Sequence, residues 1–312
     1  MTLHELLQAV RRVEVRTNRL VNDTMVGAYL SHFKGRGMDF EELREYIPGD
    51  EVRDIDWNVT YRMGRPFVKR YREERELALV LAVDISASSA FGSTRHTKRE
   101  FATEIAGTLA LSAARNSDKV ALLLFSDTVE LYLPPRKGRR HILRVLREML
   151  AHEPKRQGTN IPAALTFLNH VLHRRSIVFL LTDFLHSFAD ESLREDALHQ
   201  RASSDRNTLQ EIGLTNARHD VVCLHLHDPR ELALPNAGLL TIEDSETGEM
   251  LEVDSTRSSI REKFTRTNAE RLGEVDRALR RAGVETLRFS TADSFAQGLQ
   301  RFFETRRGRR RG

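Results

Sequence analysis

Apolar and polar residues alternate along most of the chain in a pattern that predicts an α/β fold. Short runs rich in Leu, Val and Ile are separated by longer stretches with helical spacing. In the stretch from Lys98 to Asn116, the apolar residues Phe101, Ile105, Leu109 and Ala113 recur every four positions, which indicates a helix with one buried face. Strands that alternate with helices predict a mostly parallel, doubly wound sheet.

Six strands and five helices are expected from this pattern. The predicted strands are residues 77–85, 119–126, 128–133, 176–182, 219–227 and 284–290. The predicted helices are residues 98–116, 139–152, 160–174, 258–282 and 294–306.

Three segments depart from regular alternation. Strands two and three are joined at Asp127, so we expect a hairpin and one antiparallel strand at the sheet edge. A second hairpin is expected over residues 239–253, where it would help to shape a partner surface. Residues 190–217 are polar and weakly periodic, and they predict a helix with an irregular centre around residues 202–207.

The first core strand ends in three oxygen-bearing side chains at alternate positions. Residues Leu77 to Ser88 read Leu-Ala-Leu-Val-Leu-Ala-Val-Asp-Ile-Ser-Ala-Ser, so Asp84, Ser86 and Ser88 follow the apolar run. Ligands of open α/β sheets bind beyond the carboxyl ends of the strands. One carboxylate and two hydroxyls are hard oxygen ligands that suit Mg²⁺ or another small divalent cation.

Two further oxygen-bearing residues are expected at the same sheet edge. The strand 176–182 is followed by Asp183. The loop Gln157-Gly-Thr-Asn opens a helix, with Thr159 or Asn160 as its N-cap. These positions bring a hydroxyl and a second carboxylate toward the end of the first strand.

The five residues Asp84, Ser86, Ser88, Thr159 and Asp183 resemble the metal-ion-dependent adhesion site of von Willebrand factor A-like domains. In that family the hydroxyls bind Mg²⁺ directly and the acids act largely through water. A partner carboxylate fills the sixth position. The resemblance implies a site for Mg²⁺, with Mn²⁺ as a substitute, that binds an Asp or Glu of another protein.

The segment before the first core strand carries two charged motifs. It reads Arg44-Glu-Tyr-Ile-Pro-Gly-Asp50 and then Arg53-Asp-Ile-Asp-Trp57. Pro and Gly within the first motif suit a type II turn. The alternation around Trp57 predicts a strand with one buried face. We interpret Asp54 and Asp56 as partners of nearby arginines rather than as a second metal pair.

Together with the core, this segment resembles a bacterial family known only as domain of unknown function fifty-eight. The resemblance covers about residues 20–185 and includes both motifs, the Asp84 motif and the pair Phe91-Gly92. It implies a von Willebrand factor A-like core behind an N-terminal β-rich extension. Bacterial proteins of this family commonly accompany MoxR-type AAA+ ATPases, so the resemblance implies an adaptor or co-chaperone whose partner ATPase offers the carboxylate.

Two other functional classes stay open at this point. A hydrolase could use the same cation to activate water, although no Gly-x-Ser-x-Gly motif is present and His225 and His227 alternate on one strand face, where packing is expected. A structural subunit with a vacant site is the third class. In that case Ser86 and Ser88 would cap the next helix, and Asp183 would be a turn acid.

Composition favours a cytoplasmic protein with one main domain. The chain has 312 residues, and its single cysteine, Cys223, lies in an apolar strand and excludes an intrachain disulfide. No signal peptide or membrane helix is expected. We predict an extension at 1–75, a von Willebrand factor A-like domain at 76–305 and a disordered Arg/Gly tail at 306–312.

The net charge of +4 is concentrated at the C-terminus, where five arginines lie in the last seven residues. The rest of the chain is close to neutral. Without a recognition fold or an aromatic platform, the tail does not predict specific binding to nucleic acid.

Overall fold

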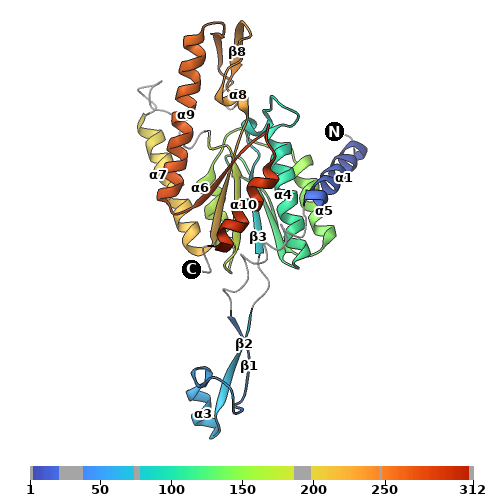
Figure 1. The fold of residues 1–312 in the computed structure, drawn as a ribbon, viewed down its shortest axis with the longest axis vertical. Coiled ribbons are helices and arrows are strands. Elements are labelled where there is room, and N and C mark those ends of the chain that lie inside the picture. Colours follow the sequence, from blue (N-terminus) through green and yellow to red (C-terminus); the bar gives the residue numbers. More distant parts are fainter. Residues whose placement is uncertain (1–2, 21–37, 74–77, 186–197, 246–247, 309–312) are drawn as a thin grey trace.

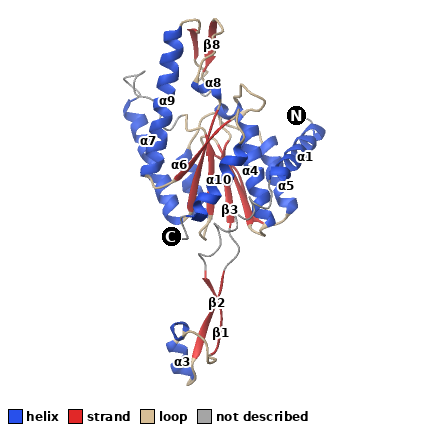
Figure 2. Ribbon diagram, in the orientation of Figure 1, coloured by secondary structure: helices blue, strands red, loops and turns tan. Residues whose placement is uncertain are grey.

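A mostly parallel six-stranded sheet with helices on both faces forms the centre of the protein (Figures 1 and 2). The computed structural model describes residues 3–20, 38–73, 78–185, 198–245 and 248–308. The strand order is β10-β7-β6-β3-β4-β5, and only β5 runs antiparallel to its neighbour. The predicted α/β class, with one antiparallel edge strand, is therefore confirmed.

The strands and helices of this domain lie close to their predicted bounds. The sheet strands are β3 (Ala78–Asp84), β4 (Lys119–Phe125), β5 (Val129–Arg136), β6 (Ile177–Thr182), β7 (Asp220–His227) and β10 (Glu285–Ser290). The helices are η2 (Ala87–Ala90), α4 (Lys98–Arg115), α5 (Arg139–Ala151), α6 (Ile161–Val171), α7 (Leu198–Arg218), α8 (Pro229–Leu232), α9 (Ser258–Arg281) and α10 (Phe295–Gly308).

Two hydrophobic cores cover the two faces of the sheet. Successive residues of β3 alternate between them, so Leu79 and Leu81 pack with α4, α5 and α10, whereas Val80 and Ala82 pack with α6, α7 and α9. Both faces of the central strands are therefore buried, which explains their unbroken apolar runs. This packing fixes the carboxyl ends of β3 and β6, where the predicted site residues follow.

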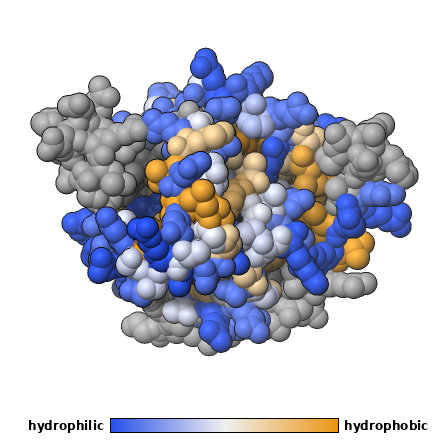
Figure 3. All heavy atoms as spheres, turned by 90° about the horizontal axis from the view of Figure 1, so that it is seen from above, coloured by the Kyte–Doolittle hydropathy of each residue, from blue (hydrophilic) through white to orange (hydrophobic). Residues whose placement is uncertain are grey.

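The second hairpin lies at the same end of the sheet. It consists of β8 (Leu239–Glu243) and β9 (Met250–Asp254), as predicted, and Figure 1 shows it beyond α8. The view from above in Figure 3 shows apolar residues gathered near the middle of this end, with hydrophilic residues around them. The hairpin contributes exposed apolar side chains, at Leu239, Met250 and Leu251.

The N-terminal extension contains two separate parts and is not β-rich as predicted, because helices hold more of its described residues than strands do. Helix α1 (Leu3–Leu20) packs against α4 and α5, where Val10 joins the core and Arg16 pairs with Glu104 at 2.6 Å. The other part is a hairpin of β1 (Met38–Glu45) and β2 (Phe67–Glu73), with η1 (Val52–Asp54) and α3 (Trp57–Met63). Figure 1 draws this hairpin apart from the six-stranded sheet. The predicted boundary at 75–76 falls among residues that the structure does not describe.

The predicted strand around Trp57 was wrong. Asp56 accepts hydrogen bonds from the backbone N–H groups of Asn58 and Val59, so it caps a helix. Trp57 begins this helix and is 65% exposed. Asp56 also pairs with Lys69 at 3.0 Å, which is an ion pair as expected but with a different partner. The helix ends at Gly64, whose φ of 67° suits glycine.

Two predictions at the far end of the chain also need correction. Helix α7 is continuous through residues 202–207, and the buried residues Thr208, Ile212 and Thr215 dock its following turns on the domain, while residues 190–197 of the predicted helix lie outside the described residues. The predicted disordered tail cannot begin at Arg306, because α10 extends to Gly308 and Arg306 pairs with Asp220 at 2.9 Å and also with Glu285.

Candidate functional site

The five residues predicted to bind a cation come together at the carboxyl edge of the sheet. Asp84 ends β3, Ser86 is the N-cap of η2, and Ser88 lies within η2. Strands β3 and β6 are parallel neighbours, with Val83 opposite Leu181, so Asp183 emerges beside Asp84. All but Thr159 are buried, and Thr159 is half-buried.

Asp84 is held at the bottom of this site by its neighbours. Its Oδ1 accepts a hydrogen bond from the backbone N–H of Ser86 at 2.9 Å. Its Oδ2 accepts hydrogen bonds from the hydroxyls of Thr182 at 2.7 Å and Thr159 at 3.4 Å. Burial, together with the nearby charge of Asp183, nevertheless raises the pKa of Asp84 to about 6.

The hydroxyls of Ser86 and Ser88 are hydrogen-bonded to each other. Their Oγ atoms lie 3.1 Å apart. Neighbouring ligands of an octahedral Mg²⁺ at its usual bond lengths are about 2.9 Å apart, so the spacing suits two adjacent ligands of one ion. The hydroxyl of Ser88 also lowers the pKa of Asp183, which places it next to the second acid.

The loop that carries Thr159 is fixed on two sides. The backbone carbonyl of Gln157 accepts a hydrogen bond from the N–H of Ala87 at 2.9 Å, and the N–H of Asn160 donates to the carbonyl of Ser126 at 2.8 Å. Asn160 is also the N-cap of α6, through a hydrogen bond from the N–H of Ala163. Thr159 is therefore left to face Asp84.

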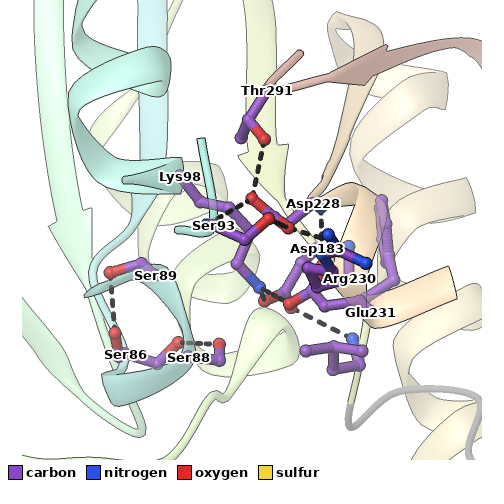
Figure 4. Close-up of polar contacts among 12 residues, drawn as sticks. Ser86, Ser88, Ser89, Ser93, Lys98, Asp183, Asp228, Arg230, Glu231 and Thr291 are labelled. Carbon is purple, nitrogen blue, oxygen red and sulfur yellow. Dashed lines mark hydrogen bonds and ion pairs between the residues drawn. The ribbon is translucent and has the colours of Figure 1, made fainter. Parts of the chain in front are cut away.

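A buried lysine that the sequence analysis missed also enters the site. Lys98 starts α4 and is 2% exposed, and its ammonium donates hydrogen bonds to Asp183 Oδ2 at 2.5 Å and to Glu231. Figure 4 shows its side chain pointing toward these two acids. Lys98 lies three positions before Phe101 on the buried stripe of α4, and a lysine in the first turn of a helix opposes the helix dipole. A lysine on the buried face and in the first turn of a helix could therefore have indicated a buried ion pair.

The charges of this cluster are unequally stabilised. Burial alone would raise the pKa of Asp183, but Lys98 and the N–H of Leu185 hold it below its usual range. Burial raises the pKa of Glu231 despite the same lysine. Burial would lower the pKa of Lys98, but Asp183 and Glu231 together raise it.

Asp228 holds Glu231 in position. Asp228 caps α8 and accepts hydrogen bonds from the backbone N–H of Ser93 at 2.9 Å and the hydroxyl of Thr291 at 2.8 Å. Its own N–H donates to Glu231 Oε2 at 2.8 Å. The sequence Asp-Pro-Arg-Glu after strand β7 has the pattern of a capping box and could have revealed this arrangement.

Gly92 allows the loop with Ser93 to approach the helix start. A Cβ at Gly92 would lie 2.5 Å from the carbonyl oxygen of His96 and 2.6 Å from Cα of Thr97.

We expect Gly92→Ala to lower the free energy of unfolding by about 1–3 kcal/mol in urea denaturation, because backbone atoms must move. Gly213→Ala in α7 is the matched control, since nothing lies within 4 Å of its Cβ. Equal stability of both variants would contradict the prediction.

His225 and Cys223 pack in the interior, as the alternation of strand β7 predicts. The ring of His225 lies edge-on to Phe184 at 5.4 Å, and burial lowers its pKa to about 3. Burial also raises the pKa of the Cys223 thiol to about 12. Neither group is prepared for proton transfer near neutral pH.

The donor set suits a hard divalent cation. No group of three or more His, Cys, Asp and Glu side chains gathers as a metal site in the described part of the chain. The candidate set instead combines two carboxylates with three hydroxyls, and few direct anionic ligands leave a bound ion able to accept an external carboxylate. Two positive charges oppose a cation here: the ammonium of Lys98, which contacts Asp183, and the partly buried guanidinium of Arg271, which acts on Asp183 and Glu231 through its charge.

The fold and the site define an α/β domain with an oxygen-rich edge, and the comparisons place it in a family. The family model "Protein of unknown function DUF58" matches residues 42–274, so the chain belongs to this family and the predicted resemblance is confirmed. An uncharacterized protein of Mycobacterium tuberculosis is 28% identical over 305 residues, which is 97% of this chain and 90% of that protein.

Solved structures match this chain only at low similarity. The protein BatB from Bacteroides thetaiotaomicron has a TM-score of 0.46 at 13% identity, over 74% of this chain and 98% of that one. The SpRpn10 VWA domain has a TM-score of 0.37 at 12% identity, over 72% and 93% of the two chains. Among the helices of the described residues, none has the length and apolar character needed to cross a membrane.

Proposed function

We propose that this protein is a metal-dependent protein-interaction module. In this proposal Asp84, Ser86, Ser88, Thr159 and Asp183 hold Mg²⁺, or Mn²⁺ in its place, and the ion binds an Asp or Glu of a protein partner. The observation that carries the proposal is the meeting of these five oxygen-bearing residues, from three separate segments, at one edge of the sheet. The α/β fold and its family suggest an interaction module at the coarser level.

The bound cation would supply an electrophilic position for the carboxylate of the partner. The protein would orient the hydroxyls of Ser86 and Ser88, keep Asp84 in place through Thr182, and hold the loop of Thr159 against η2. These tasks bind and position a ligand and require no turnover. We therefore propose a non-enzymatic role, located in the cytoplasm.

The partner that we propose is a MoxR-type AAA+ ATPase, for which this protein would act as adaptor or co-chaperone. The choice of partner rests on the family resemblance of the charged N-terminal motifs and not on a contact in the structure. Its chemical requirement is an exposed loop that carries an Asp or Glu. The apolar and polar surface of the β8–β9 hairpin, at the same end of the sheet, would flank such a loop.

A binding assay with matched serine variants tests the proposal. We expect Mg²⁺-dependent binding of a MoxR-type ATPase from the same genome, measured by biolayer interferometry, to be lost with a chelator and to weaken at least about tenfold in Ser86→Ala, because a direct oxygen ligand is removed. Ser112→Ala is the control. Its hydroxyl is also buried, but it bonds only within α4, to the carbonyl of Thr108.

Three outcomes of this assay distinguish an interaction module, a hydrolase and a structural subunit. Mg²⁺-dependent binding that Ser86→Ala weakens and Ser112→Ala does not supports the module. Metal-dependent turnover of a phosphate or peptide substrate by the wild-type protein, lost in Ser86→Ala, would establish a hydrolase instead. Binding that ignores both the chelator and Ser86→Ala would mean that a purely structural surface engages the partner.

A further inference from the structure

The ammonium of Lys98 lies among the residues proposed to hold the metal ion. It donates hydrogen bonds to Asp183 and Glu231, and its side chain is almost completely buried. A buried positive charge beside a cation site repels a divalent ion and also occupies a carboxylate that the ion would use. The protein itself therefore supplies a positive charge to this site.

We propose that Lys98 is a tethered competitor of the divalent cation, so that Mg²⁺ binds only when the ammonium leaves Asp183. This inference rests on the proposed function. In the metal-free protein Lys98 bridges Asp183 and Glu231. In the metal-bound protein it keeps Glu231 alone, and Asp183 turns to the ion.

The space around Asp84 supports this exchange. A cavity of about 10 Å³ is lined by Asp84, Lys98, Thr182 and Asp183, together with Ser89 and the apolar residues Ala102, Leu181 and Leu226, whereas the hydroxyls of Ser86, Ser88 and Thr159 do not line it. That volume is about what one water molecule needs, whereas Mg²⁺ with its remaining waters needs more. In the proposed exchange, withdrawal of the Lys98 ammonium would free the space that it now occupies beside Asp183.

Glu231 gives the displaced lysine a place to remain. Its Oε1 already accepts a hydrogen bond from the ammonium, and its Oε2 is fixed by the backbone N–H of Asp228. Figure 4 shows Glu231 and Asp183 on the same side of Lys98. Lys98 can therefore release Asp183 without leaving its charge unpaired in the interior, which would be far more costly.

The exchange makes metal binding and partner binding depend on each other. When Lys98 closes the site, the apparent affinity for Mg²⁺ is the intrinsic affinity multiplied by the fraction of molecules in the open state. A partner carboxylate that binds the ion stabilises the open state, so partner and metal each raise the affinity for the other. The site would then be loaded mainly in the complex.

A charge-neutral double substitution tests the competitor directly. Lys98→Met combined with Glu231→Gln removes one positive and one negative charge, so the net charge of the site is unchanged, while Asp183 keeps its carboxylate and loses the competing ammonium. We expect calorimetric titration of Mg²⁺ into this variant to give a dissociation constant at least roughly tenfold lower than in the wild-type protein. Because Asp183 is left without its ion-pair partner, circular dichroism and urea denaturation check that the variant is folded under the conditions of the titration.

The controls separate this inference from the proposed function. Lys263→Met removes an exposed lysine on α9 and is expected to leave the titration unchanged. Saturable Mg²⁺ binding with equal dissociation constants in the wild-type and double variants would overturn the competitor role and leave the metal site intact. Titrations without any binding in both proteins would overturn the competitor and the metal-dependent function together.

Discussion

Substitution of Lys98 by methionine alone is expected to destabilise the protein by about 3–5 kcal/mol. The methionine fills similar space, but Asp183 and Glu231 then lose the ammonium that pairs with both of them in a buried environment. Removal of one partner from a buried ion pair leaves uncompensated charge, which is among the largest effects that a single substitution produces. Urea denaturation at neutral pH in a chelator measures the loss.

The pH dependence of this variant has a definite sign. In the wild-type protein the pKa of Asp183 is lowered, so its stabilising contribution is present above the ordinary pKa of 3.8 and is lost as the pH falls through the lower folded value. Without Lys98, Asp183 loses the largest contribution that lowers its pKa, and the N–H of Leu185, the hydroxyl of Ser88 and the charge of Arg271 are left to oppose burial there. Burial already raises the pKa of Glu231, so the folded state is expected to bind protons more tightly than the unfolded state. The variant should therefore regain stability as the pH is lowered toward 5.

Substitution of an exposed lysine is the control for the expected loss of stability in Lys98→Met. Lys263→Met, on the exposed surface of α9, should change the free energy of unfolding by less than about 0.5 kcal/mol. A loss in Lys98→Met no larger than that of the control would show that water reaches the two acids. The ion pair would then not close the site.

The sheet could be predicted from the sequence because its strands are buried on both faces. Each central strand is an apolar run bounded by turn residues, and the helices show a regular buried stripe. The prediction failed where local hydrogen bonds decide the structure. The alternation around Trp57 suggested a strand, but the carboxylate of Asp56 caps a helix at that position.

The candidate site could be predicted only as far as each residue follows a strand or opens a helix. Asp84, Ser86, Ser88 and Asp183 follow directly from that rule. Lys98 and Glu231 are separated by 133 positions, and their contact depends on how α4 and α8 meet above the sheet. Such tertiary pairing of charges leaves no periodic signal, whereas the apolar stripes that position the two helices do.

Asp84→Asn is expected to stabilise the metal-free protein at neutral pH and to abolish its response to Mg²⁺. Burial and the charge of Asp183 raise the pKa of Asp84 from 3.8 to about 6. Between these two values the folded state holds a proton that the unfolded state releases, so the free energy of unfolding falls as the pH rises. Above about pH 6 the full cost, roughly 3 kcal/mol at most, is present, and asparagine avoids it.

Asp228→Asn is the matched control, because it should behave in the opposite way. Asp228 is also buried after a strand, but its pKa is lowered by donors that include Ser93 and Thr291, so its carboxylate stabilises the fold above pH 4 and that contribution is lost in acid. Urea denaturation from pH 4 to 8, with and without Mg²⁺, compares the two variants with the wild type. Only proteins that bind the ion should gain stability from it.

Destabilisation of Asp84→Asn by more than about 1 kcal/mol at pH 7 would mean that the hydrogen bonds of Asp84 outweigh its burial, and the acid would then be structural. A stabilised variant that no longer responds to Mg²⁺ would instead show a charge kept at a cost to the fold, as expected for a residue retained for binding.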